Sequence, residues 1–137
     1  MIELKPSTGK TGSLLVNGKP WGTMRRELLE RIETVKYNIE HARITIDSSE
    51  KQVQKLVLSG HSTDAGILRR GISERQIHLN ADARELDELV AALDELTAIR
   101  IRFETDRLMQ AAQNDLNAAL TKHDERITEF RNYLESF

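Results

Sequence analysis

Residues 81–137 read ADARELDELVAALDELTAIRIRFETDRLMQAAQNDLNAALTKHDERITEFRNYLESF, and this segment of 57 residues contains no glycine or proline. Its large apolar residues recur at steps of three and four, which is the spacing of one face of an α-helix. The segment therefore predicts one long amphipathic helix, or two helices in line, over residues 81–136.

The apolar spacing of this segment falls into two runs of different phase. The first run comprises Leu86, Leu89, Leu93, Leu96 and Phe103, with Arg100 in the intervening position. The second run follows the a and d positions of a coiled coil without interruption, and comprises Leu116, Leu120, His123, Ile127, Phe130, Leu134 and Phe137. The step from Phe103 to Met109 is one residue short of a heptad, so we expect over-winding, a kink or a change of packing partner there.

A second long helix is predicted over residues 23–58. Thr23 is a candidate N-cap, and Gly60 is a candidate stop. The near-heptad positions between them carry apolar or small residues, namely Leu28, Ile32, Val35, Ile39, Ala42, Ile46, Ser49, Val53 and Leu56. Residues 59–80 contain Gly66 and Gly71, which weaken a helix, so we expect a partly ordered connector there.

Residues 1–22 differ from the rest of the chain, because they hold four of the seven glycines and both prolines. Asn17-Gly18 follows the apolar run Leu14–Val16 and predicts a β-hairpin or an extended arm. Trp21, the only tryptophan, would either close the end of a helical bundle or anchor a partner. We therefore expect an N-terminal arm over 1–22 and a helical domain over 23–137.

These elements predict an all-α fold, an elongated antiparallel helical hairpin or coiled-coil bundle with a short N-terminal arm. An unbroken C-terminal helix would be roughly 85 Å long. This is too long for a compact domain of this size, which has a radius of gyration of about 14 Å, so the molecule would be elongated unless the helix bends back. The first helix is shorter than the second, so roughly 20 C-terminal residues lack a partner within the hairpin.

The charge is unevenly distributed along the chain. Residues 1–80 carry 13 Lys/Arg and 9 Asp/Glu, whereas residues 81–137 carry 7 and 13, although the net charge of the whole is only -2. Attraction between the two helices is the simplest use of this difference. The chain has no cysteine, and we expect a cytoplasmic protein without a membrane segment.

No motif in the sequence points to catalysis, a cofactor or a metal. Gly9-Lys10-Thr11 matches the end of a phosphate-binding loop, but Leu4 stands where its first glycine belongs and no helix is predicted to follow. His61, Asp64 and His78 are of metal-binding types but lack the spacing of a helical metal motif. The carboxylates lie among opposite charges on helix faces, so we expect a non-enzymatic protein.

The function predicted from these patterns is protein–protein interaction, as a homo-oligomeric assembly, adaptor or inhibitor protein of bacterial or phage type. The predicted partner and oligomer interface comprises Leu120, His123, Ile127, Phe130, Leu134, Phe137 and Trp21. An accessory role on nucleic acid ranks second, with Arg69, Arg70 and Arg75 as anion contacts and the basic residues of the arm beside them. A small ligand at a helical subunit interface is a third alternative, because Arg100, Arg102 and Arg107 cluster near the phase break.

Overall fold

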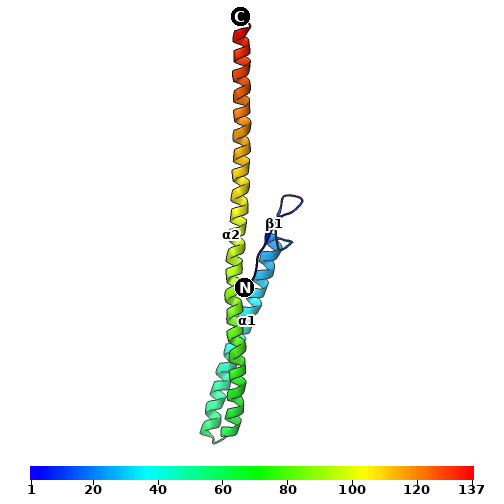
Figure 1. Cartoon of the computed structure of the whole chain (residues 1–137). Helices are drawn as coiled ribbons and strands as arrows, with labels where there is room; N and C mark the ends of the chain where they lie inside the picture. Colours follow the sequence, from blue (N-terminus) through cyan, green and yellow to red (C-terminus); the bar gives the residue numbers. More distant parts are fainter. The chain divides into compact units, whose positions relative to one another are not determined.

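The structure is a computed structural model that describes all 137 residues. The elements are three strands and two helices, and 82% of the chain is helical. They are β1 (Pro6–Thr8), β2 (Leu14–Val16), β3 (Lys19–Pro20), α1 (Trp21–Leu58) and α2 (Ser62–Glu135) (Figure 1). The predicted helical hairpin with an N-terminal arm is confirmed. The chain forms two compact units, Met1–Thr97 and Ala98–Phe137, so the arm belongs to the same unit as the hairpin.

The N-terminal arm is a small antiparallel sheet with strand order β1-β2-β3. Asn17 and Gly18 both have positive φ, 53° and 77°, as a tight two-residue hairpin turn requires. The Asn17 side chain accepts a hydrogen bond from the Lys5 amide at 2.7 Å and donates one to the Glu3 carbonyl at 3.0 Å. These bonds hold the first residues of the chain against the hairpin, and Val16 on β2 is fully buried.

Helix α1 begins at Trp21, directly after β3, with Pro20 at the N-cap position. The prediction of Thr23 as N-cap is therefore wrong. Proline fixes its own φ and cannot donate a backbone hydrogen bond, so Pro20 suits the last position before a helix. No side chain caps this end of α1; Lys19 and Glu27 form an ion pair of 2.9 Å across the junction.

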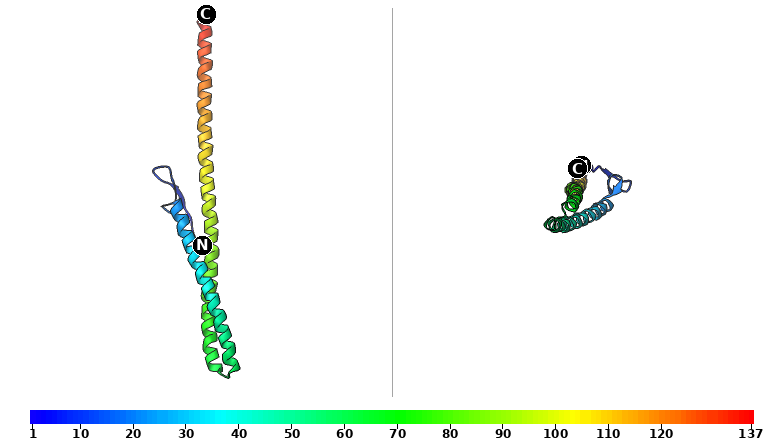
Figure 2. Two further views of the ribbon diagram at one scale, coloured as in Figure 1. Left: turned by 180° about the vertical axis from the view of Figure 1, so that it is seen from behind. Right: turned by 90° about the horizontal axis from the view of Figure 1, so that it is seen from below.

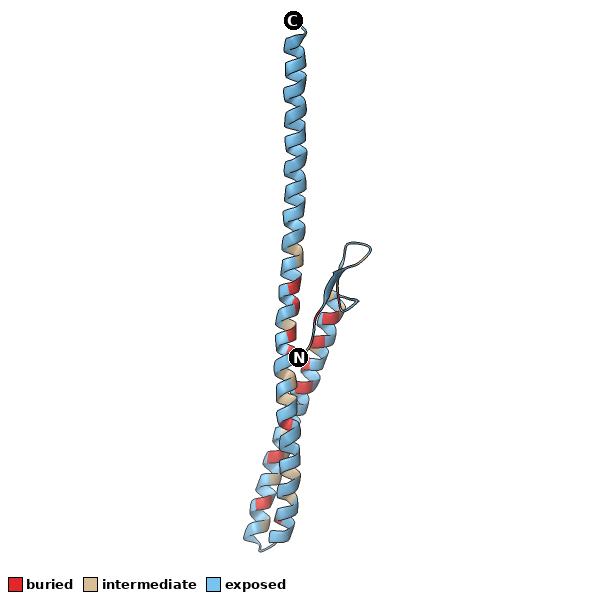
Figure 3. Ribbon diagram, viewed as in Figure 1, coloured by how far each residue is buried: buried red, intermediate tan, exposed pale blue.

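One face of α1 is buried along its length, and it is the predicted face (Figure 3). Ala42, Ser49 and Leu56 are half-buried at the same spacing. The buried residues are Met24, Leu28, Ile32, Val35, Ile39, Ile46 and Val53. The helix ends at Leu58, and Gly60 has a φ of +80°, which confirms it as the stop.

The connector predicted over residues 59–80 is wrong, because α2 starts at Ser62 and only Ser59, Gly60 and His61 lie between the helices. The heptad rhythm of Leu86–Phe103 extends upstream at the same steps to Leu79 and Ala65, both of which are buried. Each helical glycine costs about 1 kcal/mol relative to alanine. Burial of large side chains along this face outweighs that cost, at roughly 1.5–3 kcal/mol each.

Within the first unit, α1 and the first part of α2 run side by side in opposite directions (Figures 1 and 2). The Trp21 indole N–H donates to the Leu96 carbonyl at 2.8 Å, and Arg31 pairs with Glu85 at 2.7 Å. The hydrogen bond to Glu85 and the charge of that carboxylate raise the pKa of Arg31. The contact joins a basic residue of the first half of the chain to an acidic residue of the second half.

The inter-helix turn allows a paired test with two glycines. Gly60→Ala places a side chain at positive φ, and should lower the free energy of unfolding by about 1 kcal/mol. Gly66→Ala lies in the interior of α2 with no atom within 4 Å of the added Cβ, and should raise it by roughly 0.5–1 kcal/mol. Urea unfolding of both variants measures the difference; the same sign for both would contradict the turn as described.

The second unit, Ala98–Phe137, consists of the remaining part of α2 and the two residues that follow it. Ile99 is buried and Phe103 and Glu104 are half-buried, while every residue from Thr105 to Phe137 is exposed. Burial thus ends where the heptad phase breaks, although α2 continues through that point. The exposed segment is longer than the roughly 20 residues expected, because α2 starts at Ser62 and α1 pairs with residues that were assigned to the connector.

Candidate functional site

The most extensive exposed apolar feature of the second unit is the heptad seam between Leu116 and Phe137. We call this surface the C-terminal seam. Its apolar members are exposed as follows: Leu116 53%, Leu120 52%, Ile127 42%, Phe130 62%, Leu134 54% and Phe137 88%. His123 lies between Leu120 and Ile127 and is exposed as well. All of them except Leu116 belong to the predicted interface. The residues up to Leu134 share one face of α2 at steps of four and three, and Phe137 follows the end of the helix at Glu135.

An uncovered apolar seam of this length disfavours the isolated helix in water. Most helical stability in proteins comes from packing of an amphipathic face, not from intrinsic propensity. Each large side chain left in water forgoes roughly 1.5–3 kcal/mol of burial. The large exposed apolar side chains from Thr105 onward follow the spacing of this seam, except for Leu108 and Tyr133; Met109 lies one heptad before Leu116. The C-terminal seam therefore has the chemistry of an association surface.

Trp21 is separate from the C-terminal seam and belongs to the first unit. Its indole N–H donates to Leu96 of the same chain, and the ring is half-buried. This contact closes the end of the helical hairpin, which is one of the two roles expected from the sequence. The structure therefore supplies an intrachain contact for the tryptophan, and the other predicted interface residues belong to the second unit.

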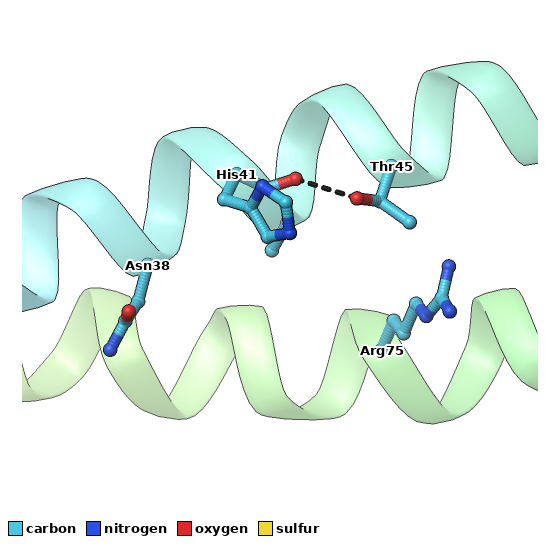
Figure 4. A pocket seen from close by; sticks show the side chains of 5 residues that line it. Asn38, His41, Thr45 and Arg75 are labelled. Carbon is cyan, nitrogen blue, oxygen red and sulfur yellow. Dashed lines mark hydrogen bonds between the residues drawn. The ribbon is translucent and has the colours of Figure 1, made fainter.

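Arg75 lies in an open recess between α1 and α2 of about 280 Å³, opposite Asn38, His41, Ala42 and Thr45 (Figure 4). The recess has a simple origin. Arg75 occupies a heptad position of α2 and the small Ala42 lines the same space, so this layer lacks two large apolar side chains. The Thr45 hydroxyl donates to the His41 carbonyl of its own helix at 2.9 Å, which leaves it little capacity to donate to a ligand.

The basic residues proposed as a nucleic-acid surface do not converge. Arg69 and Arg70 are exposed near the turn between the helices. The basic residues of the arm and of the start of α1 lie at the other end of the hairpin, so Arg25 and Arg70 are separated by roughly 30 Å along the helices. A continuous basic groove along a phosphate backbone is not formed by these side chains.

The Gly9-Lys10-Thr11 segment lies in the turn between β1 and β2. The Gly9 amide donates to the Ser13 carbonyl at 2.8 Å, and the Gly12 amide donates to the Gly9 carbonyl at 3.0 Å. A phosphate-binding loop needs free backbone amides and a following helix, whereas here the Gly9 and Gly12 amides are used within the turn and a strand follows.

We therefore expect Lys10→Ala to leave the thermal shift produced by ATP or GTP unchanged. A shift that is present in the wild type and lost in the variant would contradict this.

The other candidate groups are also dispersed. His61 lies in the inter-helix turn, and His78 is 17 residues further along α2, about 25 Å away. No group of three or more histidine, aspartate or glutamate residues is placed to hold a metal ion. Arg100 and Arg107 share a face of α2 at heptad spacing, but Arg102 lies about 200° around the helix from Arg100, so the three arginines do not form one ligand site.

Sequence reasoning alone identified the apolar members of the C-terminal seam but not the charges beside them. Asp124 and Arg131 each directly follow a seam residue, and Arg126 and Tyr133 each directly precede one. All four are exposed, and the three charged groups have no ion-pair partner within the chain. The heptad assignment could have found them, because the e and g positions follow directly from a and d.

Neither helix is long and apolar enough to cross a lipid bilayer. No protein-family model, curated protein or solved structure matches the chain.

Proposed function

We propose that the protein is a non-enzymatic interaction module that assembles with itself through the C-terminal seam. The observation that carries this proposal is the exposure of all seven seam residues, six on one face of α2 and Phe137 directly after its end. Two copies of such a seam can bury each other as interlocking side chains of a coiled coil. The role fits a homo-oligomeric assembly, adaptor or inhibitor protein.

Charge supports a second copy as the partner. Residues 81–137 as a whole have a net charge of -6, but residues 120–137 carry three basic and four acidic side chains. Like charges oppose association, and a segment with a net charge of -1 opposes its own association very little. A strongly basic partner would instead be expected to face an acidic seam, which is absent here.

Co-expression of two tagged copies tests the proposal. One copy carries an affinity tag at its N-terminus and the other carries a distinct epitope tag. Retention of the epitope-tagged copy on the affinity resin is expected, and Leu120→Asp with Ile127→Asp in both copies should abolish it. Retention that persists in this double variant would show that the two copies associate through another surface.

A further inference from the structure

We infer that two copies pair along the C-terminal seam in antiparallel orientation, with Ile127 of each copy packed against Phe130 of the other. This inference rests on the proposed self-association and goes beyond it, because it assigns the direction and the register of the pair. The charged residues beside the seam determine both, and all of them lie in the second unit.

The heptad positions follow from the steps of the seam. Leu120, Ile127 and Leu134 occupy a positions, and Leu116, His123, Phe130 and Phe137 occupy d positions. The e positions next to d then include Asp124 and Arg131, and the g positions next to a include Arg126 and Tyr133. Residues at e and g flank the interface of a coiled coil and set the orientation of the chains.

A parallel pair brings like charges together. In parallel coiled coils, each g residue faces the e residue of the following heptad in the other chain. Arg126 would therefore face Arg131 of the second copy, and the symmetry of the pair repeats this repulsion on the other side. The remaining pair, Ala119 with Asp124, contributes no compensating attraction.

An antiparallel pair removes this repulsion. Reversing one chain brings e positions opposite e positions and g positions opposite g positions. When Ile127 faces Phe130 of the second copy, Asp124 faces Arg131 of that copy, and symmetry supplies a second such ion pair. Arg126 meets Tyr133 of the second copy, where a guanidinium can stack on the aromatic ring.

Charge also selects one antiparallel register. A shift of one heptad in one direction places Asp124 opposite Asp124 of the second copy, and Arg126 opposite Arg126 of that copy. A shift in the other direction places Arg131 opposite Arg131 of the second copy. Of these three registers, only the intermediate one pairs Asp124 with Arg131 and brings no like charges together.

The side-chain layers of this register agree with the charges. The two central layers are both Ile127 with Phe130, and the outer layers are Leu120 with Phe137. His123 meets Leu134 in layers between these, so no layer pairs two polar groups. Polar groups in a seam cost stability and often fix register, and this register keeps the two histidines apart.

Disulfide cross-linking tests direction and register together, because the chain contains no cysteine. The full chain is prepared as Leu120→Cys and as Phe137→Cys, and each is first shown by light scattering to associate when reduced. In the proposed pair, residue 120 of one copy faces residue 137 of the other, while identical positions lie about 25 Å apart, too far for a disulfide. Oxidation should therefore cross-link a mixture of the two variants and neither variant alone.

The possible outcomes separate the inference from the function on which it rests. Cross-linking of each variant with itself would establish a parallel pair and overturn the inference, while self-association would stand. Association without any cross-link in the mixture would also overturn it, because the register would be different. Failure of the wild-type chain to associate would overturn the proposed function itself.

A charge exchange gives an independent readout without cysteines. Arg131→Asp should weaken association by roughly five- to thirtyfold, since two ion pairs become two repulsions between carboxylates. Adding Asp124→Arg to the same chain restores opposite charges and should recover most of the affinity. In a parallel pair, Arg131→Asp would instead face Arg126 and strengthen association, a result that contradicts the antiparallel assignment.

Discussion

Phe130→Asp should convert the self-associated protein into a monomer. Phe130 lies at the centre of the C-terminal seam and is 62% exposed in the single chain. The substitution removes the burial of an aromatic ring and places a carboxylate against Ile127 of the second copy without a partner, twice in each pair. We expect the dissociation constant to rise at least about a hundredfold, which is about 2.7 kcal/mol, as measured by light scattering over a concentration series.

The matched control is Asn132→Asp, which adds the same charge two residues away on the outward face of α2. Because Asn132 occupies an f position, we expect its dissociation constant to stay within a few-fold of the wild type. Far-UV circular dichroism of both variants distinguishes lost association from lost folding of the first unit. A monomeric Asn132→Asp variant would indicate a net-charge effect in place of a specific seam.

Leu96→Ala should cost the first unit about 2–5 kcal/mol in its free energy of unfolding. Leu96 is fully buried, and it is the largest side chain of the protein with no exposed surface. Truncation leaves a cavity at the end of the hairpin, beside the carbonyl that accepts the Trp21 indole N–H. Urea-induced unfolding followed by tryptophan fluorescence reports on this location directly.

Leu108→Ala is the control for this prediction, since the same atoms are removed from a residue that is 69% exposed and occupies a c position of the second unit. We expect a change within about 0.5 kcal/mol. A similar loss for both leucines would mean that the hairpin packing around Leu96 is not as described.

The helices and their buried faces could be predicted because their apolar residues repeat with helical spacing. Val35 and Leu96, for example, both lie on predicted seams and both are fully buried. The Asn17-Gly18 turn was also predictable, since few residue pairs accept positive φ at both positions.

The start of α2 could not be predicted by weighing local propensity. Gly66 and Gly71 lower that propensity, but Ala65 and Leu79 continue the heptad rhythm upstream of Leu86, and tertiary burial along that rhythm prevails. That error follows from ranking local signals above the periodicity of the packed face. The start of α1 could not be predicted from a capping residue, because no side chain caps the helix at Pro20 and threonine is a common cap.

For the candidate site, the sequence predicted which residues form the C-terminal seam, since α2 continues through it with the expected spacing. Trp21 was grouped with these residues because an aromatic ring at a helix end suits either packing or binding. Its contact with Leu96 joins residues 75 positions apart, and no local pattern encodes such a separation. The dispersal of the basic residues likewise depends on the antiparallel course of the helices.

Sedimentation equilibrium of the wild-type chain tests the central claim, self-association through the C-terminal seam, most directly. At about 50 μM, well above a typical micromolar dissociation constant, we expect a mass of twice the 15.6 kDa of one chain, falling toward one chain on dilution. A mass of one chain at this concentration, with helix content intact, would contradict the account.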